Sequence, residues 1–313
     1  MDTPKAVILV GGEGTRLRPL TLNTHKCMVP IINRPFLEHL LSNLRKHGVR
    51  EVVFALCHLH NQIVDHFGDG SAFGMKLHYV VEDTPLGTAG AVRNAERFLD
   101  GTFFVLNGDV YTDLDLTALL KLHKRQSAMA TIALTYVEDT RAFGVVETAE
   151  SGRVMRFLEK PQPGVSAAKT VNAGTYVLEP QTLALIPRNQ PYMFEHGLFP
   201  TLLKDGQPVY GYPSSCYWMD IGTPQRYLDL NQHLLRCEPM LGSYSHLQNI
   251  RRDGGYNIHP LARVRGPVLL GQDCHVGAGA EVIGPTVLGP GCYVEAGARV
   301  ISSVLWPGAR VES

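Results

Sequence analysis

The pattern of apolar and polar positions changes character along this chain of 313 residues. Up to about residue 235, short apolar runs of strand length alternate with stretches whose apolar residues recur at helical spacing. This alternation predicts βαβ units and a Rossmann-like α/β fold, with a mixed, mostly parallel sheet flanked by helices. We expect strands at 6–10, 51–56, 76–81, 102–106, 129–137 and 209–212, and helices at 36–47, 61–67, 89–99, 114–126, 181–185, 194–203 and 225–235.

Between about Arg141 and Val177 the pattern shifts to short β segments, at 145–146, 154–158 and 175–178. We interpret this stretch as a substrate-binding insert or lid on the sheet.

A period of six residues begins after residue 256. Every sixth residue from Ile258 to Trp306 is apolar, and the residue four positions after each is mostly small. This period predicts a parallel β-helix, left-handed by resemblance to hexapeptide-repeat proteins. The expected domains are an α/β domain at 1–237, a linker at 238–256 and the repeats at 257–313. The repeat still runs at Ser313 without a polar cap, so we expect that another subunit covers this end or that the chain is truncated there.

Composition excludes several classes of partner. Lys plus Arg and Asp plus Glu both number 29, and this balance favours neither nucleic acid nor a membrane surface as a partner. No apolar run approaches the roughly 20 residues of a transmembrane helix. The six cysteines form no CxxC pair, and the first strand begins too early to leave room for a signal peptide. We therefore expect a cytoplasmic protein with reduced thiols.

The strand at 6–10 ends in a loop that suits a polyphosphate. Ligands bind at the carboxyl edge of a parallel sheet, where glycines let backbone N–H groups approach phosphates. A Walker A loop would need GxxxxGK[ST] and a dinucleotide fingerprint would need GxGxxG, and this loop has neither. Its glycines are Gly11, Gly12 and Gly14. They are followed by Thr15 and then by two cations, Arg16 and Lys26.

The run GGEGTRLRPLT followed by Lys26 resembles the signature of the sugar-1-phosphate nucleotidyltransferases, in the branch that acts on hexose 1-phosphates. In the two-function acetylglucosamine-1-phosphate uridylyltransferases, the corresponding stretch is shorter and lacks RPLT. The resemblance implies an enzyme that joins a hexose 1-phosphate to a nucleoside triphosphate, releases pyrophosphate and uses Mg²⁺. It also implies nucleotide contacts from Leu9, Gly11, Gly12, Gly14, Thr15, Arg16, Lys26, Glu82, Gly87 and Thr88.

Such a reaction brings several negative charges together, so cations and a divalent metal must supply most of the catalysis. By the resemblance, Arg16 contacts the leaving pyrophosphate and Lys26 the α-phosphate. Asp109 follows a predicted strand end, and together with Asp220 it matches the two carboxylates that hold Mg²⁺ in the family. With Lys160, these residues are the expected catalytic set.

Three further segments resemble the family's sugar site. In Phe157-Leu158-Glu159-Lys160-Pro161, which resembles FxEKP, Lys160 would hold the sugar phosphate and Glu159 would accept hydrogen bonds from sugar hydroxyls. In FGVV at 143–146, Gly144 would offer close backbone approach. In VNAG at 171–174, Asn172 would offer its amide to the sugar.

The identity of the base stays open. The stretch 82–90 corresponds to the family's nucleobase loop, and its LGTAG resembles guanylyltransferases that act on mannose 1-phosphate. Thymidylyl- and uridylyltransferase relatives carry close variants, so glucose 1-phosphate with dTTP or UTP is the second interpretation.

Two alternatives come from other classes. Some family members are non-catalytic sensors of nucleotide-sugar, and the presence of the whole expected catalytic set argues against this. An acyltransferase or bifunctional enzyme could use His259 or His275 in the repeats, but nothing around either supports that. We interpret Cys27 as a packed bystander and His58 and His60 as surface residues. An uncapped β-helix also predicts a homo-oligomer.

Overall fold

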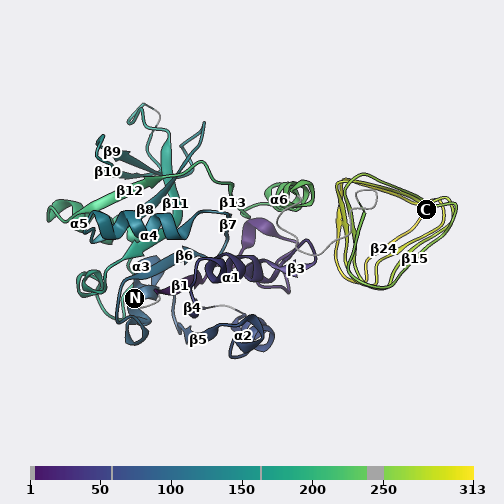
Figure 1. Ribbon diagram of the computed structural model, residues 1–313, viewed down its shortest axis with the longest axis horizontal. Helices are drawn as coiled ribbons and strands as arrows, with labels where there is room; N and C mark the ends of the chain where they lie inside the picture. Colours follow the sequence, from purple (N-terminus) through teal and green to yellow (C-terminus); the bar gives the residue numbers. More distant parts are fainter. Residues whose placement is uncertain (1–3, 58, 163, 238–249) are drawn as a thin grey trace. The chain divides into compact units, whose positions relative to one another are not determined.

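The computed structural model describes residues 4–57, 59–162, 164–237 and 250–313 and contains two compact units (Figure 1). The first consists of the chain up to Gly14 together with Asn23–Met28 and Leu37–Asp220. The second consists of Thr15–Leu22, Val29–Phe36 and Ile221–Ser313.

A nine-stranded sheet organises the first unit, in the order β10-β9-β11-β6-β1-β4-β5, with β8 paired to both β11 and β12. Strands β6, β1, β4 and β5 are parallel, whereas β11 is antiparallel to β6, β8 and β9. The predicted mixed α/β sheet is therefore confirmed. The strands are β1 (Lys5–Val10), β4 (Glu51–Leu56), β5 (Lys76–Val81), β6 (Phe103–Asn107), β8 (Ala130–Tyr136), β9 (Gly144–Thr148), β10 (Val154–Glu159), β11 (Thr170–Leu178) and β12 (Val209–Pro213).

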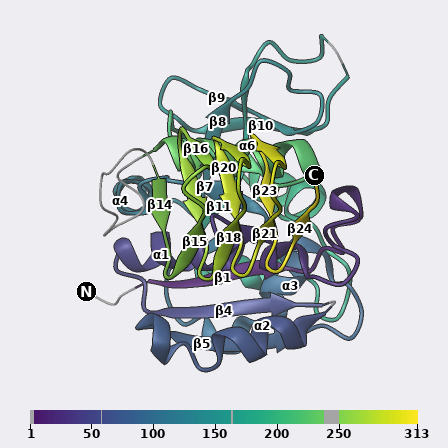
Figure 2. The ribbon, with the colours of Figure 1, turned by 90° about the vertical axis from the view of Figure 1, so that its right-hand side faces the viewer.

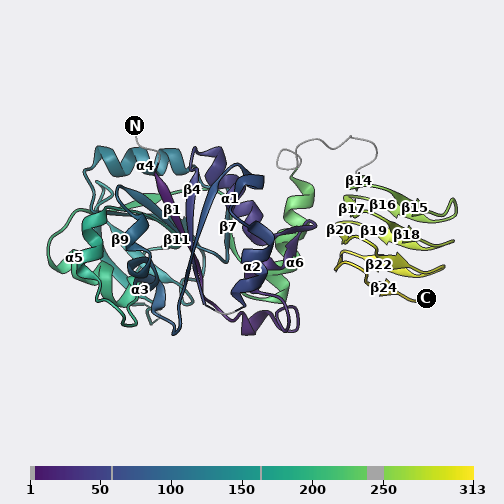
Figure 3. The ribbon, with the colours of Figure 1, turned by 90° about the horizontal axis from the view of Figure 1, so that it is seen from below.

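Helices cover both faces of this sheet. In Figure 3, α4 lies on one side, against β8, β11 and β12, and α3 lies on the other, against β1 and β4. Central strands of this kind are apolar on both faces, and Ala6, Val7 and Ile8 of β1 are all fully buried. None of the helices among the described residues combines the length and apolarity needed to cross a bilayer. The helices of this unit are α1 (Phe36–Lys46), α2 (His60–Phe67), α3 (Gly87–Asn94), α4 (Leu116–Arg125) and α5 (Phe199–Lys204), with 3₁₀ turns η3 (Ser71–Phe73), η4 (Glu96–Phe98) and η5 (Pro180–Leu185).

Two details differ from the sequence expectations. The β segments expected as an insert or lid belong to the main sheet, because β9 pairs with β11 through Val145 and Val171 and carries β10 at the sheet edge. The helix expected at 194–203 is a π-helix, η6 (Phe194–Leu198), followed by α5. Apolar spacing alone does not separate these helix types.

The second unit contains three parallel sheets, in the orders β14-β17-β20-β23, β15-β18-β21-β24 and β16-β19-β22. Their strands lie side by side along a coil that is triangular in end view, an arrangement consistent with a parallel β-helix (Figures 1 and 2). Partner residues such as Ile250, Val268 and Thr286 lie 18 apart, which is three six-residue repeats. The strands are β14 (Ile250–Arg252), β15 (Tyr256–Ile258), β16 (Arg263–Arg265), β17 (Val268–Leu270), β18 (Cys274–Val276), β19 (Glu281–Ile283), β20 (Thr286–Leu288), β21 (Tyr293–Val294), β22 (Arg299–Ile301), β23 (Val304–Leu305) and β24 (Arg310–Val311).

The six-residue period slips by one in the last coil. Leu288 pairs with Leu305, which is 17 residues on, so Leu305 rather than Trp306 packs against the core of the repeats. The shortened turn contains Ser302 in the left-handed region (φ 48°). Trp306 instead donates its indole N–H to the Tyr227 hydroxyl at 2.9 Å.

The boundaries of the repeats also differ from the expected ones. Strand β14 begins at Ile250, inside the stretch expected as a linker, and residues 238–249 lie outside the described part of the chain. Helix α6 (Pro224–Arg236) belongs to the same unit as the repeats. Leu269 and Val287 point outward from their strands yet are each 1% exposed, and α6 contacts β20 of that sheet.

His123 is a buried histidine of the first unit with two polar side-chain partners. His123 on α4 is 1% exposed, with Nδ1 2.8 Å from the Thr131 hydroxyl and Nε2 3.0 Å from Glu179 Oε1. A neutral imidazole can accept from the hydroxyl and donate to the carboxylate. Burial lowers the pKa of His123 below its ordinary value of 6.5, although Glu179 opposes this.

We predict that acidification destabilises the protein partly through His123. Below about pH 6.5, His123 is protonated in the unfolded chain, whereas its buried imidazole in the folded protein stays neutral. The free energy of unfolding therefore falls as the pH drops. His123→Gln should lower Tm at pH 7.5, by the equivalent of about 1–3 kcal/mol, yet lose less Tm between pH 7.5 and 5.5 than the native chain. The exposed His66→Gln is the control, and an unchanged pH dependence in His123→Gln would contradict the assignment.

Candidate active site

The glycine loop after β1 lies beside the end of β6, the neighbouring parallel strand. Gly108, just after β6, donates its N–H to the Leu9 carbonyl at 2.9 Å. A Cβ at position 108 would lie 2.5 Å from that carbonyl oxygen, so only glycine fits this close approach. Gly11 and Gly12 are exposed at the same edge. The expected polyphosphate loop and Asp109 therefore lie together at the carboxyl edge of the sheet.

A buried lysine is paired with Asp109. Lys26 begins the 3₁₀ turn η2 (Lys26–Met28) and is 7% exposed, and its Nζ lies 2.5 Å from Asp109 Oδ2. The Asp109 side chain is 39% exposed. A buried ammonium needs such a partner, and the pair leaves part of the carboxylate open to solvent.

Asp220 lies beside this pair in the backbone. It ends β13 (Trp218–Asp220), which is antiparallel to β7 (Val110–Thr112), and it stands opposite Val110, the residue after Asp109. Asp109 thus directly precedes β7, and Asp220 ends the strand that pairs with β7. The described residues contain no cluster of three or more His, Cys, Asp or Glu placed to hold a metal. Mg²⁺ commonly takes only one or two carboxylates, with phosphate oxygens and water completing its shell.

The expected sugar-site residues Gly144 and Glu159 face each other across β9 and β10. A Cβ at position 144 would lie 2.8 Å from Glu159 Oε2 and 2.8 Å from the Phe157 ring, so glycine makes room for this carboxylate. Lys160 follows in the left-handed region (φ 44°). Its side chain is 64% exposed, with Nζ 3.5 Å from Glu159 Oε1.

The pairing of β11 with β8 is irregular between Asn172 and Tyr176, and Asn172 is the residue at which the irregularity begins. Its side chain accepts the Gly174 N–H at 2.9 Å and donates to the Tyr176 hydroxyl at 2.8 Å. The irregularity also exposes the Ala173 carbonyl to the Trp218 indole N–H, at 2.9 Å. Asn172 is therefore held in place by contacts within the protein.

Trp218 joins three of the expected segments, and the sequence motifs assigned it no role. It bonds to β11 as described, its ring packs edge-on against Phe143 at 5.5 Å, and it lies on β13 two residues before Asp220. An aromatic residue two positions before a candidate metal ligand is the signal that the sequence offers. Its contacts bring the sugar-site strands to the carboxylate pair.

The expected nucleobase loop is held by its own carboxylate. Glu82 is 8% exposed and accepts the Leu86 N–H at 2.9 Å, and burial raises its pKa although this bond opposes the shift. Gly87 adopts φ 72°, and a Cβ there would lie 2.8 Å from Met193 Sδ. Thr88 bonds through its hydroxyl to Glu195 and Phe194.

Four other residues considered from the sequence are Thr15, Arg16, Cys27 and His275, and each has a well-defined position in the structure. Thr15 and Arg16 are exposed in the 3₁₀ turn η1 (Thr15–Leu17), which belongs to the second unit. Cys27 is buried, and burial raises the pKa of its thiol, which suits a packed bystander. His275 stacks on Tyr293 at 4.3 Å.

The remaining histidines are similarly placed. His259 accepts the Leu261 N–H at 3.1 Å through Nδ1. His60 is partly exposed, with Nδ1 3.4 Å from the Cys57 carbonyl. His58 lies outside the described residues.

Comparisons with known proteins identify nucleotidyltransferases as relatives of this chain. A family model described as Nucleotidyl transferase matches residues 5–236. The mannose-1-phosphate guanylyltransferase of Mycobacterium tuberculosis is 39% identical over 280 residues, covering 88% of this chain and 77% of that protein. The UTP–glucose-1-phosphate uridylyltransferase of Synechocystis sp. is 34% identical over 314 residues, covering 89% and 81%. The crystal structure of HddC from Yersinia pseudotuberculosis complexed with GMP-PN matches with a TM-score of 0.64 at 27% identity, covering 74% and 99%.

The burial of Lys26 predicts an asymmetry between two substitutions. Asp109→Ala leaves a buried ammonium without its partner, which in a fully buried pair costs about 3–5 kcal/mol. Because the carboxylate is partly exposed, we expect about 2 kcal/mol here. Lys26→Met removes the buried charge and leaves an Asp109 that water can reach, so it should cost less than about 1 kcal/mol. Thermal unfolding with EDTA present measures both, and an equal or reversed order would contradict the pairing.

Proposed function

This chain belongs to the nucleotidyl transferase family, and we propose that it joins mannose 1-phosphate to GTP, releasing pyrophosphate and forming GDP-mannose. The family predicted from the glycine loop and Lys26 is confirmed by the match over residues 5–236. The base and sugar are supported by LGTAG in the nucleobase loop and by the name of the mycobacterial relative.

The observation that carries the proposal is the adjacency of Lys26, Asp109 and the backbone of Asp220 at the carboxyl edge of the sheet. This edge is where a triphosphate would meet the glycine loop. Asp109 and Asp220 supply the oxygen ligands that Mg²⁺ prefers, and Mg²⁺ bound there would neutralise phosphate charge.

The reaction is an in-line displacement. An oxygen of the sugar phosphate attacks the α-phosphorus of the triphosphate, and the bond from that phosphorus to the pyrophosphate oxygen breaks. Lys26 would bind the α-phosphate, Arg16 the leaving pyrophosphate and Lys160 the attacking phosphate, so each cation offsets charge that the reaction brings together. Gly144, Glu159 and Asn172 would orient the sugar.

Several finer points are also proposals. Glucose 1-phosphate with UTP or dTTP is the second candidate pair, favoured by the Synechocystis relative. We propose that the C-terminal coil is a left-handed β-helix of hexapeptide repeats that mediates self-association. A cytoplasmic location also stays a prediction.

A matrix of pyrophosphate-release assays, pairing each triphosphate with each sugar phosphate in Mg²⁺, tests the function. GTP with mannose 1-phosphate should give the highest kcat/KM. Binding of nucleotide-sugar without turnover of any pair would instead support the sensor function, and consumption of acyl-CoA would support the acyltransferase.

The carboxylate pair carries a separate prediction. Asp109→Asn and Asp220→Asn should each lower kcat by about a hundredfold or more, because each variant loses a charged oxygen ligand that would hold Mg²⁺, the ion that would neutralise phosphate charge. Both asparagines preserve shape, so circular dichroism should be unchanged. Near-native rates in both variants would exclude the metal assignment.

Lys160 should act on one substrate only. Lys160→Ala is expected to raise KM for the sugar phosphate about tenfold, the loss of roughly 1.4 kcal/mol from a charge-assisted contact. KM for the triphosphate should stay within about twofold. An effect confined to the triphosphate would contradict this role.

A further inference from the structure

We propose that Glu195 is a positioning residue that links the nucleobase loop to the sugar site, so that binding of one substrate favours binding of the other. The proposal rests on the function proposed above. No motif in the sequence pointed to Glu195, and every residue in the argument belongs to the first unit.

The nucleobase loop is fastened to the segment just before Glu195. Tyr192 donates its N–H to the Leu86 carbonyl at 2.8 Å, and its own carbonyl accepts from Ala89 and Gly90 at 3.0 and 2.9 Å. A Cβ on Gly90 would lie 3.0 Å from the Gln190 carbonyl, so the two backbones are in close contact. A shift of the loop therefore moves this segment with it.

Thr88 connects these two hydrogen-bonded backbone segments to the Glu195 carboxylate. Its Oγ1 accepts the Phe194 N–H at 2.9 Å and lies 3.2 Å from Glu195 Oε2. A hydroxyl has one proton to donate, and a carboxylate is the strongest acceptor in its reach. The Thr88 proton is therefore committed to Glu195.

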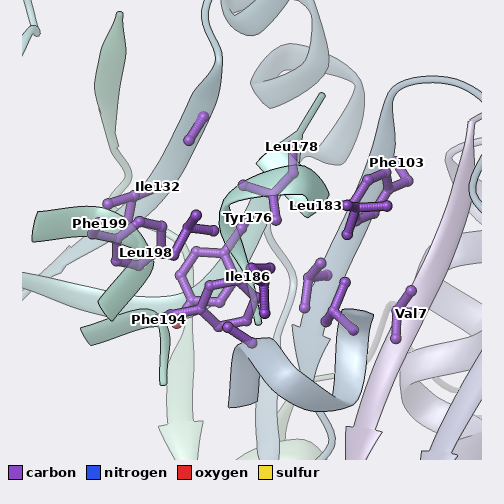
Figure 4. Packing of buried hydrophobic residues seen from close by; sticks show 14 of the residues in the cluster. Val7, Phe103, Ile132, Tyr176, Leu178, Leu183, Ile186, Phe194, Leu198 and Phe199 are labelled. Carbon is purple, nitrogen blue, oxygen red and sulfur yellow. The ribbon is translucent and has the colours of Figure 1, made fainter. Parts of the chain in front are cut away.

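A π-helix holds Glu195 in this position. Segment η6 places Glu195 in its first turn, and π-helices are rare and are frequent at functional sites. Phe194 stacks on Phe199 at 5.4 Å, and both rings pack against Tyr176 of β11 at 5.1 and 5.3 Å. Figure 4 shows these three rings gathered in the core. The backbone on either side of Glu195 is thereby anchored to the sheet.

Glu195 also lies close to the sugar-site strands, because η6 contacts β10, the strand that ends at Glu159, and Phe157 of β10 packs against Phe199 at 5.4 Å. Burial raises the pKa of Glu195, and the nearby negative charge of Glu159 adds to the shift. Burial likewise raises the pKa of the Tyr176 hydroxyl, with the charge of Glu195 as the next cause. That hydroxyl accepts from Asn172 at 2.8 Å, so Glu195 lies near the charge of one expected sugar-binding residue, Glu159, and near the hydrogen-bond partner of another, Asn172.

The arrangement forms a series from base to sugar: loop, Thr88, Glu195, then Glu159 and the Tyr176–Asn172 pair. A bound base that fixes the loop also fixes Thr88. Through Thr88 it fixes the position of the Glu195 carboxylate, whose negative charge acts on Glu159. A ligand that orders one part of such a series lowers the cost of ordering the rest for the second ligand. By linkage, the sugar phosphate must strengthen nucleotide binding by the same factor.

Calorimetry on the full-length chain measures this factor without turnover. The probes are mannose 1-phosphate and the GTP analogue whose α–β bridging oxygen is a methylene group, or the matching analogue of whichever pair turns over. The Kd of each is measured alone and with the other saturating. We expect the native chain to show coupling of about fivefold or more, and Thr88→Val and Glu195→Gln each to reduce it below about twofold.

The chain provides a matched control. Thr102 donates to Glu179 at 2.7 Å, another Thr–Glu bond in the same unit but in the His123 network. Thr102→Val should leave coupling unchanged whatever it does to Tm. Because the links act in series, the Thr88→Val and Glu195→Gln double variant should lose no more coupling than either single variant.

Native coupling in Glu195→Gln, or loss of coupling in Thr102→Val, would overturn the role of Glu195. A native chain that turns over its substrates without coupling would also overturn it while leaving the proposed function intact. A native chain that binds neither probe and turns over no pair would overturn both.

Discussion

The buried ammonium of Lys26 imposes the constraint on which the candidate site depends. An ammonium that is 7% exposed requires a negative partner, and Asp109 supplies it from 83 residues further along the chain. Asp109 can do so because β6 is the parallel neighbour of β1, and Gly108 lets the two chain segments approach closely. A phosphate that replaces this carboxylate as the partner of Lys26 would be bound where the proposed reaction needs it.

The sugar side of the site is built by antiparallel strands added to that parallel core. At the irregularity in β11 the Ala173 carbonyl accepts from Trp218, which ties β11 to the strand that carries Asp220, while the Asn172 side chain bonds within β11 itself. Gly144 leaves space for Glu159. The two proposed subsites therefore share a rigid frame, and η6 adds a second connection between them through Thr88 and Glu195.

Several sequence expectations agree with the structure because they rest on local rules. Apolar runs located the strands of the sheet, and the six-residue period located the parallel strands of the repeats. The expectations that differ are those in which local pattern is ambiguous. An expected lid belongs to the sheet, because pairing of Val145 with Val171 is not visible in either segment alone. The last repeat slips by one residue at the shortened turn that contains Ser302, and the apolar pattern does not reveal the slip because both Leu305 and Trp306 are apolar.

By itself, the sequence determined the family and the residue types that carry the chemistry, because phosphate binding requires glycines, cations and carboxylates at characteristic spacings. Tertiary structure alone decided which of these side chains meet. It paired Lys26 with Asp109, set Asp220 opposite Val110, and committed the Thr88 hydroxyl to a carboxylate 107 residues away. The physical reason is that local pattern sets the direction of a side chain on its own element, whereas its partner is set by which elements pack together.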